Sequence, residues 1–250
     1  MPEKKLKVHP HTKNKSVRVK LIAYTKDPEQ VVAAAIRQCY SRIGARELRK
    51  KIDKKTRKRL IAQVISSGHT STIEHASFTF AIEGVSRACT HQLVRHRIAS
   101  YSQQSQRYVS FDKNGFDYII PPSIKRNKDL LKEFNNFIKE VTRLYKNLVD
   151  KGIPAEDARF VLPNACETKI VMTMNGRSLL NFFKERMCMR AQWEIRAVAN
   201  QMYRQVKKKA PNIFKYAGPT CETEKICWQG NLSCGRWKRI KGAELRKRTK

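Results

Sequence analysis

Acidic residues and long apolar runs are both scarce in this 250-residue chain. It has 21 Asp and Glu residues against 53 Lys and Arg, a formal net charge of +32. No run approaches the roughly 18 apolar residues of a membrane helix, and the N-terminus lacks the apolar core of a secretory signal. Seven cysteines, an odd number without dense spacing, do not form a disulfide framework and suit a reducing compartment. We therefore expect a cytoplasmic protein with no membrane partner.

The chain also lacks a glycine-rich phosphate loop. Its most polar stretch, "RHRIASYSQQSQRY" at residues 95–108, has no glycine, which excludes a P-loop or a dinucleotide fingerprint there. The stretch gathers Arg, His, Ser and Gln with hardly any solubilising Lys or Glu. Arginine forks bind phosphate bidentately, and Ser and Gln add neutral donors. The composition favours a loop that binds a nucleotide or another multi-oxygen anion over a solvated surface.

Positive charge gathers elsewhere, mainly at the chain ends and on expected helix faces. Residues 1–20 hold 7 basic residues, 42–59 hold 10, 204–209 hold 4 and 236–250 hold 8. Basic surfaces neutralise phosphates, so nonspecific attraction of nucleic acid is expected. A nucleic-acid-binding module is accordingly kept as the alternative function.

Hydrophobic periodicity predicts an α+β fold. One domain is expected, with a mixed or antiparallel sheet flanked by helices. Its bounds are 17–220, between a basic N-terminal extension at 1–16 and a cysteine-containing basic tail at 221–250. Strands are expected at 17–24, 75–84, 117–122 and 167–174. Helices are expected at 28–39, 53–66, 86–94, 127–149 and 154–163, and one or two packed helices at 175–206. Asp27 is a possible N-cap of the first helix, whose expected apolar stripe is Val31, Val32, Ala35, Ile36 and Cys39.

The stretch "NGRSLLNFFKER" is the second candidate for a site. Asn175 stands at the expected N-cap, where anions bind, and Arg177 and Asn181 lie one helical turn apart. Arg186 lies among Phe and Met residues, so its guanidinium either reaches solvent along the helix or points into a pocket.

Metal and thiol chemistry are weaker candidates. His69, Glu74 and His75 do not have the spacing of a zinc helix. Cys166 is predicted to be a buried small residue rather than a nucleophile. The tail cysteines have C-x5-C-x6-C spacing, wider than usual for zinc, so a metal with a fourth ligand and reduced surface thiols both stay open. No metal is assigned to the catalytic site. The tail cysteines are Cys221, Cys227 and Cys234.

These stretches together resemble the flavin-dependent thymidylate synthases. Residues 95–105 match the R-H-R-x7-S signature of that family, and four further blocks resemble the family in the same order over about residues 17–220. These blocks are "GHTSTIEHASFTF", "HQLVRHR", "ARFVLP" and "NGRSLLNFFKERMCMRAQWEIR".

The resemblance implies a homotetramer with active sites at subunit interfaces. The family methylates deoxyuridine monophosphate (dUMP) to thymidine monophosphate (dTMP) and takes the carbon from methylenetetrahydrofolate. FAD, reduced by NADPH, supplies the hydride, and no cysteine nucleophile is needed.

The resemblance also implies roles for individual residues. Arg186 would lie against the uracil edge and favour loss of the N3 proton. The FAD-binding residues would be Ser71, Arg95, His96, Arg97, Gln103, Asn175, Arg177 and Asn181, with Asn175, Arg177 and Asn181 supplied by another subunit. The dUMP-binding residues would be Gln92, Arg95, Gln103, Gln104, Ser105, Arg107, Arg159 and Arg186, with Arg159 reaching the phosphate from a neighbour.

The chain departs from some relatives at four positions. Gln103 stands where they have Glu, Ser102 where they have Asn, Cys39 where they have Ser, and Arg190 where they have His. Gln103 can still donate and accept hydrogen bonds, whereas a role that needs a carboxylate is lost.

Overall fold

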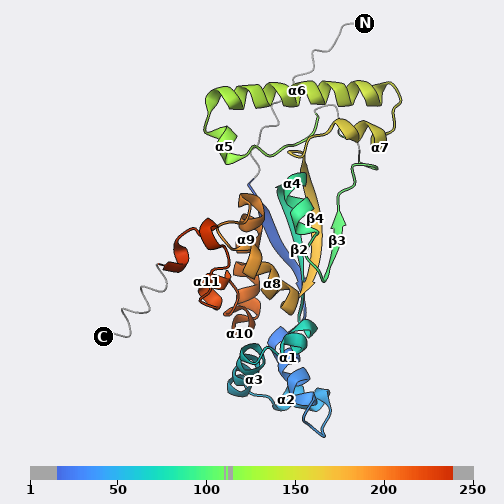
Figure 1. Ribbon diagram of the computed structural model, residues 1–250. Coiled ribbons are helices and arrows are strands. Elements are labelled where there is room, and N and C mark those ends of the chain that lie inside the picture. Colours follow the sequence, from blue (N-terminus) through green and yellow to red (C-terminus); the bar gives the residue numbers. More distant parts are fainter. Residues whose placement is uncertain (1–15, 110, 112–114, 239–250) are drawn as a thin grey trace. The chain divides into compact units, whose positions relative to one another are not determined.

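The computed structural model describes residues 16–109, 111 and 115–238. The chain forms two compact units (Figure 1). Among the described residues, the first unit comprises 16–17, 83–91 and 103–170, and the second comprises 18–82, 92–102 and 171–238. No helix in the described ranges is long and apolar enough to cross a membrane. The expected basic extension, except Ser16, and the end of the basic tail lie outside the described residues.

Four strands form one sheet with the order β1-β2-β4-β3. Their bounds are Arg18–Tyr24 for β1, Ser77–Ser86 for β2, Glu167–Asn175 for β4 and Ala99–Gln103 for β3. Strands β2 and β4 run antiparallel, because the hydroxyls of Thr79 and Thr173 meet at 3.0 Å while the Gly84 amide donates to the Glu167 carboxylate at 3.0 Å. The α+β class with an antiparallel sheet is thus confirmed.

The first unit is built around one long helix. Phe116, Ile138, Val141 and Cys166 form its buried core. Asn127 caps α6 as its side chain accepts from the amides of residues 129 and 130, which confirms the predicted start of this helix. The helices that lie wholly in this unit are α5 (Pro122–Lys125), α6 (Lys128–Asp150), α7 (Ala155–Ala158) and the 3-10 turn η2 (Arg159–Val161), and α4 (Arg87–Leu93) begins here.

The second unit contains most of the helices. They are α1 (Pro28–Gln38), α2 (Ala45–Lys51), α3 (Lys54–Ser66), η1 (Thr70–His75), α8 (Gly176–Arg186), α9 (Trp193–Lys209), α10 (Pro211–Phe214), α11 (Thr220–Thr223) and η3 (Gly230–Leu232). Its core is aromatic: Phe78 of β2 meets Phe214 edge to face at 5.3 Å between ring centroids, and Phe183 lies 6.0 Å from Phe214. Each fully buried side chain of this size stabilises the fold by about 1.5–3 kcal/mol.

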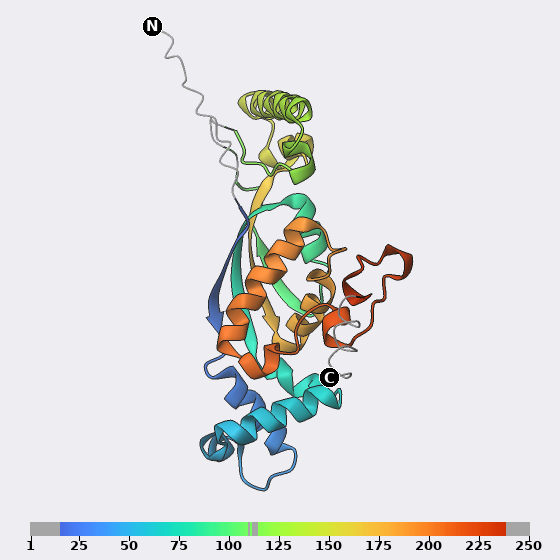
Figure 2. The same ribbon diagram turned by 90° about the vertical axis from the view of Figure 1, so that its left-hand side faces the viewer.

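Helix α9 lies along the edge strand β1 in the second unit (Figure 2). Two glutamines of α9 bond the strand backbone: Gln201 accepts from the Val19 amide at 3.1 Å and Gln205 from the Leu21 amide at 2.7 Å. Gln205 also donates to the Val19 carbonyl at 2.9 Å. These bonds satisfy backbone groups that an edge strand would otherwise expose.

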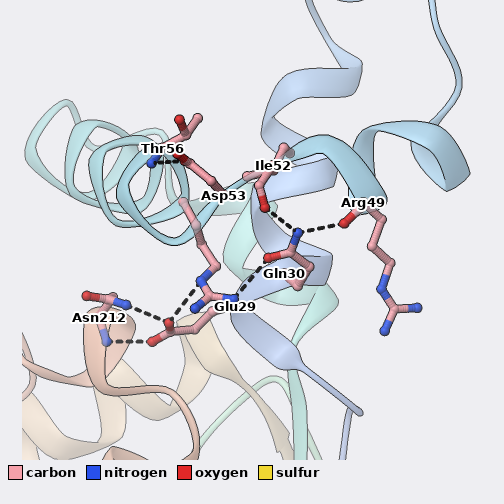
Figure 3. A network of polar contacts seen from close by, with 8 residues as sticks. Glu29, Gln30, Arg49, Ile52, Asp53, Thr56 and Asn212 are labelled. Carbon is pink, nitrogen blue, oxygen red and sulfur yellow. Dashed lines mark hydrogen bonds and ion pairs between the residues drawn. The ribbon is translucent and has the colours of Figure 1, made fainter.

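A polar network joins the helices near the start of α1 (Figure 3). Glu29 is 5% exposed and accepts two hydrogen bonds from Asn212. The backbone N–H donates at 2.5 Å and the side-chain Nδ2 at 2.6 Å. Arg57 of α3 lies 3.7 Å from the same carboxylate and donates to Gln30 at 3.0 Å. The buried charge is therefore paired, which offsets the cost of removing it from water.

Several local predictions are corrected by the structure. Asp27 stands at the N-cap of α1, but its side chain makes no capping bond and instead pairs with Arg49. The apolar face of α1 is also displaced, since Ala33 and Ala34 are buried while Cys39 is exposed. Helix α2 was not predicted, because its sequence "ARELRKK" buries only one residue, Leu48.

Two strand assignments also differ from expectation. The polar stretch 95–108 is not a continuous loop, since it contains β3 and is paired to β4 through the Gln104 amide and the Lys169 carbonyl at 2.9 Å. Residues 117–122 form no strand but a single bridge between Tyr118 and Cys166. Strand β2 and helix α4 agree with expectation: Ala76, Phe78, Phe80 and Ile82 are fully buried at alternate positions, and the Ser86 hydroxyl accepts from the Cys89 amide at 3.1 Å.

Candidate active site

Helix α8 begins against the start of β2. Asn175 caps the helix, as predicted, by accepting from the Ser178 amide at 2.8 Å. The Gly176 amide donates to the Ala76 carbonyl at 2.7 Å, and a Cβ on Gly176 would lie 2.8 Å from the side chain of Ile73. Only glycine permits this approach of helix to η1. The first turn of α8 is therefore fixed beside the "GHTSTIEH" segment.

Arg177 uses that position to pair with Glu74. Its guanidinium donates to the Glu74 carboxylate at 2.7 Å, with both side chains partly exposed. Glu74 thus orients an arginine. Among the residues that the structure describes, no three His, Cys, Asp or Glu side chains come close enough together to hold an ion.

Arg177 and Asn181 line one cavity of about 770 Å³ in the second unit. Thr70 of η1, Lys184 of α8 and the tail residues 222–224 also line it. The predicted residue Ser71 is exposed on η1 beside Thr70 but does not line this cavity. Sequence spacing therefore placed Arg177 and Asn181 on one face correctly.

Arg186 points inward to His96 rather than to solvent. Its Nε donates to His96 Nε2 at 2.7 Å. His96 is 6% exposed and lies edge to face on the Phe182 ring at 4.8 Å between centroids. Phe182 and Arg186 are one turn apart on α8, so one face of this helix makes both the ring contact and the hydrogen bond to the imidazole. The helix and the R-H-R segment are thereby joined.

This contact requires neutral His96, because Nε2 must accept a hydrogen bond. Burial lowers the pKa of His96, and the nearby Arg186 cation lowers it further, while Glu185 acts in the opposite direction. The bond to the imidazole uses only the Nε–H of Arg186, so the N–H groups at the end of the guanidinium are not needed for it.

Tyr101 is a residue that the sequence analysis missed. Its hydroxyl is within donating distance of two backbone carbonyls, at 2.8 Å from that of Leu93 and 3.0 Å from that of His96. Burial raises its pKa to about 12, so the hydroxyl stays protonated. It closes the R-H-R turn from β3. The signal in the sequence was a tyrosine in the middle of a polar stretch.

The other two basic residues of the R-H-R segment face solvent. Arg95 and Arg97 are exposed on either side of buried His96, and the Ile98 amide that follows donates to the Ser178 hydroxyl at 3.3 Å. Gln92 is half-buried near the end of α4. A buried imidazole thus anchors two outward cations, an arrangement suited to an anionic ligand.

The predicted nucleotide residues from 103 onward lie in the first unit. Gln103 donates to the Thr90 hydroxyl at 2.9 Å and to the Thr168 hydroxyl at 3.1 Å. Thr90 in turn donates to the Arg87 carbonyl at 3.0 Å, so its oxygen accepts from Gln103. The two threonine hydroxyls therefore engage the side-chain nitrogen of Gln103, and its side-chain oxygen can accept from another donor. The threonines were not predicted.

Two arginines predicted to bind the nucleotide, Arg107 and Arg159, meet at Glu156 in the first unit. Arg107 forms an ion pair with the Glu156 carboxylate, and Arg159 Nε donates to the Glu156 carbonyl at 3.0 Å. The Ser105 hydroxyl accepts from the Arg107 amide at 3.1 Å and shapes this turn, while Gln104 bonds β4 through its backbone. A bound phosphate would compete with Glu156 for Arg107.

Cys166 is fully buried, as predicted. Burial raises the pKa of its thiol to about 12, although hydrogen bonding from Gln106 at 3.4 Å and the charge of Arg87 act in the opposite direction. A thiol that stays protonated at neutral pH attacks carbon poorly.

The family model for "Thymidylate synthase complementing protein" matches residues 20–212. The chain is 51% identical to a flavin-dependent thymidylate synthase of Geobacter sulfurreducens over 225 residues, covering 90% of this chain and 97% of that protein. The chain belongs to the flavin-dependent thymidylate synthase family. Similar enzymes occur in Clostridium tetani, 49% identical over 94% of this chain and 98% of that protein, and in Pyrococcus furiosus, 44% identical over 86% and 91%.

The fold agrees with this family membership. The chain is similar to a solved structure of a UMP/dUMP methylase, PolB from Streptomyces cacaoi bound with 5-Br dUMP. The similarity covers 80% of this chain and 94% of the PolB chain. The TM-score is 0.68 and the identity is 24%, so the likeness concerns the fold. Residues 20–212, which the family model matches, include every residue that the resemblance assigns to FAD or dUMP binding.

Proposed function

We propose that this chain catalyses the reductive methylation of dUMP to dTMP, with methylenetetrahydrofolate as carbon donor and NADPH as reductant of FAD. The observation that carries the proposal is the bond from Arg186 to buried, neutral His96. It joins the family signature to α8 and holds Arg186, the residue that the resemblance assigns to the uracil edge, against the R-H-R segment.

The donor set suits a bound flavin. Arg95 and Arg97 are exposed cations, and Arg177 and Asn181 line one cavity with room for a ring system. When bound, FAD supplies the hydride for the methyl group. Cations near its pyrimidine ring stabilise the anionic reduced form. In the assembly, we propose that Asn175, Arg177 and Asn181 serve the flavin of a neighbouring subunit within a homotetramer.

Arg186 is the proposed catalytic residue. Its donors stabilise the uracil oxygens as N3 loses its proton, and a preorganised guanidinium in a water-poor site does so without reorganisation. The increased electron density on the ring then favours attack by uracil C5 on the one-carbon unit. His96 acts as a positioning residue because it accepts from Nε and leaves the other guanidinium donors for the nucleotide.

The remaining residues would bind the nucleotide. Arg107 and Arg159 offer cations for the phosphate, together with the Ser105 hydroxyl. Both threonine hydroxyls accept from the Gln103 amide nitrogen, which leaves the amide oxygen for a donor. It would therefore accept a hydrogen bond from the sugar or the flavin, the role open to an amide where some relatives have Glu.

The test is a reconstitution with purified protein. We expect bound flavin absorbance, bleaching by NADPH that is faster with dUMP present, and dTMP formation that depends on methylenetetrahydrofolate. Failure of the chain to bind FAD after loading, or bleaching without any dTMP, would contradict the proposal. A truncation that removes 1–16 and 239–250 should keep turnover, which separates this function from nucleic-acid binding by the basic ends.

A further inference from the structure

Four of the seven cysteines line a single cavity in the second unit. Cys188 lies between α8 and α9, Cys221 lies on α11, and Cys227 and Cys234 lie on either side of η3. The cavity has a volume of about 500 Å³. Cys188 and Cys227 are both within electrostatic range of the Cys221 thiol. The other three cysteines of the chain, Cys39, Cys89 and Cys166, do not line it.

The segment that carries three of these thiols is fastened to α8 and to itself. Lys184 of α8 pairs with Glu224, and Arg236 pairs with Glu222. The Trp237 indole donates to the Lys225 carbonyl at 2.6 Å. Residues 221–237 are therefore held near Cys188 by contacts that do not involve sulfur.

We propose that Cys188, Cys221, Cys227 and Cys234 bind one thiophilic divalent cation, zinc above all, that clamps the C-terminal segment onto the α8–α9 corner. The C-x5-C-x6-C spacing supplies three ligands, and the fold brings the fourth from a position 33 residues before Cys221. Four thiolates in a closed tetrahedral set are a structural zinc site. This inference does not depend on the proposed reaction.

Binding requires the thiols to draw together. As they stand, no three described His, Cys, Asp or Glu side chains are close enough to share an ion. Loading converts four thiols and Zn²⁺ into a tetrathiolate complex with two negative charges and releases four protons. Lys184, Arg190 and Arg236 line the same cavity and oppose that charge.

The clamp would also affect the neighbouring cavity. Glu222, Thr223 and Glu224 line the cavity that holds Arg177 and Asn181, and they follow Cys221 directly. Fixing Cys221 therefore fixes one wall of the predicted flavin-binding region. We expect metal loss to weaken FAD binding several-fold without removing it.

Metal content is the decisive measurement. The full chain is purified under reducing conditions, loaded with zinc, freed of loose metal by gel filtration and analysed by atomic emission. We expect about one zinc per chain, and thiol-to-metal absorbance after exchange with cadmium. The variants Cys188→Ser and Cys221→Ser should lose the tightly held metal. The matched control Cys39→Ser, an exposed cysteine outside the cavity, should keep it.

Two results would overturn the inference: a reduced wild-type chain that retains no zinc after loading, or a Cys188→Ser variant that retains all of it. Should a variant fail to fold, the cadmium absorbance of the wild-type chain still counts the thiolates bound, and fewer than three would contradict the site. Flavin absorbance, recorded on the same samples, separates this outcome from failure of the proposed function.

Discussion

The two halves of the polar stretch 95–108 lie in different compact units and hold their side chains by different means. In the first half, a buried imidazole receives a bond from Arg186 and the flanking Arg95 and Arg97 face solvent. In the second half, two buried threonines hold the neutral Gln103 amide. The first half presents charge from a buried anchor, and the second presents a neutral group of fixed orientation. One continuous motif can therefore serve an electrostatic task and a recognition task.

Removing the guanidinium from the first half should have the largest effect. We expect Arg186→Ala to reduce kcat for dTMP formation by about 10²–10³-fold, the usual loss when one preorganised donor to a developing charge is removed. Flavin absorbance should persist. Arg186→Lys is the matched control: it keeps the charge but loses the planar fork, so it should recover only a small part of kcat. An alanine variant with half of normal turnover would refute the assigned role.

Changing the anchor tests whether His96 positions Arg186. His96→Ala should lower kcat by about 10–100-fold, since small misplacements of a catalytic group carry costs of this order. His96→Gln retains an acceptor and should recover most of that loss. FAD content, measured in parallel, is expected to change less than kcat in both variants. Equal losses in the two variants would contradict a positioning role.

The same anchor predicts a pH dependence. Because the pKa of His96 is lowered in the folded chain, the unfolded chain takes up a proton first as pH falls below about 6.5. Stability contributed by neutral His96 is thus present above that pH and is lost on acidification. The acidic fall of kcat should move or disappear in His96→Gln, which urea unfolding and pH–rate profiles can show side by side.

The sequence predicted the elements whose periodicity is strong. Strand β2 alternates buried Phe78, Phe80 and Ile82 with less buried residues, and α6 repeats apolar residues at helical spacing, so both were found with nearly correct bounds. Helix α2 was missed because seven mostly charged residues bury only Leu48. Asp27 resembled a cap, yet its backbone is left-handed at φ 50°, so the carboxylate turns to Arg49.

The site was predictable only as a set of residue types. Spacing placed Asn175 correctly at the start of α8 and Arg177 and Asn181 correctly on one face, because a cap and a helical turn are local features. The partners of the site residues were not predictable. Thr168 contacts Gln103 across 65 residues of sequence, and Tyr101 closes a turn onto carbonyls 5 and 8 residues earlier, so neither contact follows the period of a helix or a strand. The sequence analysis left open whether Arg186 points inward, and the bond to His96 decides it.

In the second half of the stretch, a charge should be less well tolerated than the amide. Gln103→Glu loses both N–H donors to the threonines, and the Thr90 hydroxyl already donates to the Arg87 backbone carbonyl. We therefore expect a loss of about 1–2 kcal/mol in the free energy of unfolding at pH 7. The loss should diminish as pH falls and the carboxyl is protonated. Urea unfolding at two pH values measures this, with Gln104→Glu as the control, and an unchanged stability would mean that Thr90 reorients.

The smallest effect is expected at Cys166, which lies beneath the same half of the stretch. Because burial raises its pKa to about 12, the thiol stays protonated at neutral pH and should resist alkylation in the folded chain. Cys166→Ala removes a sulfur that accepts from Gln106 at 3.4 Å and leaves a small cavity, so a modest loss of stability of about 1 kcal/mol is expected. Turnover should stay within about twofold, since no step needs a nucleophile with so high a pKa. A covalent nucleotide adduct at this residue, detected by mass spectrometry, would reverse the argument and assign the chemistry to the first unit.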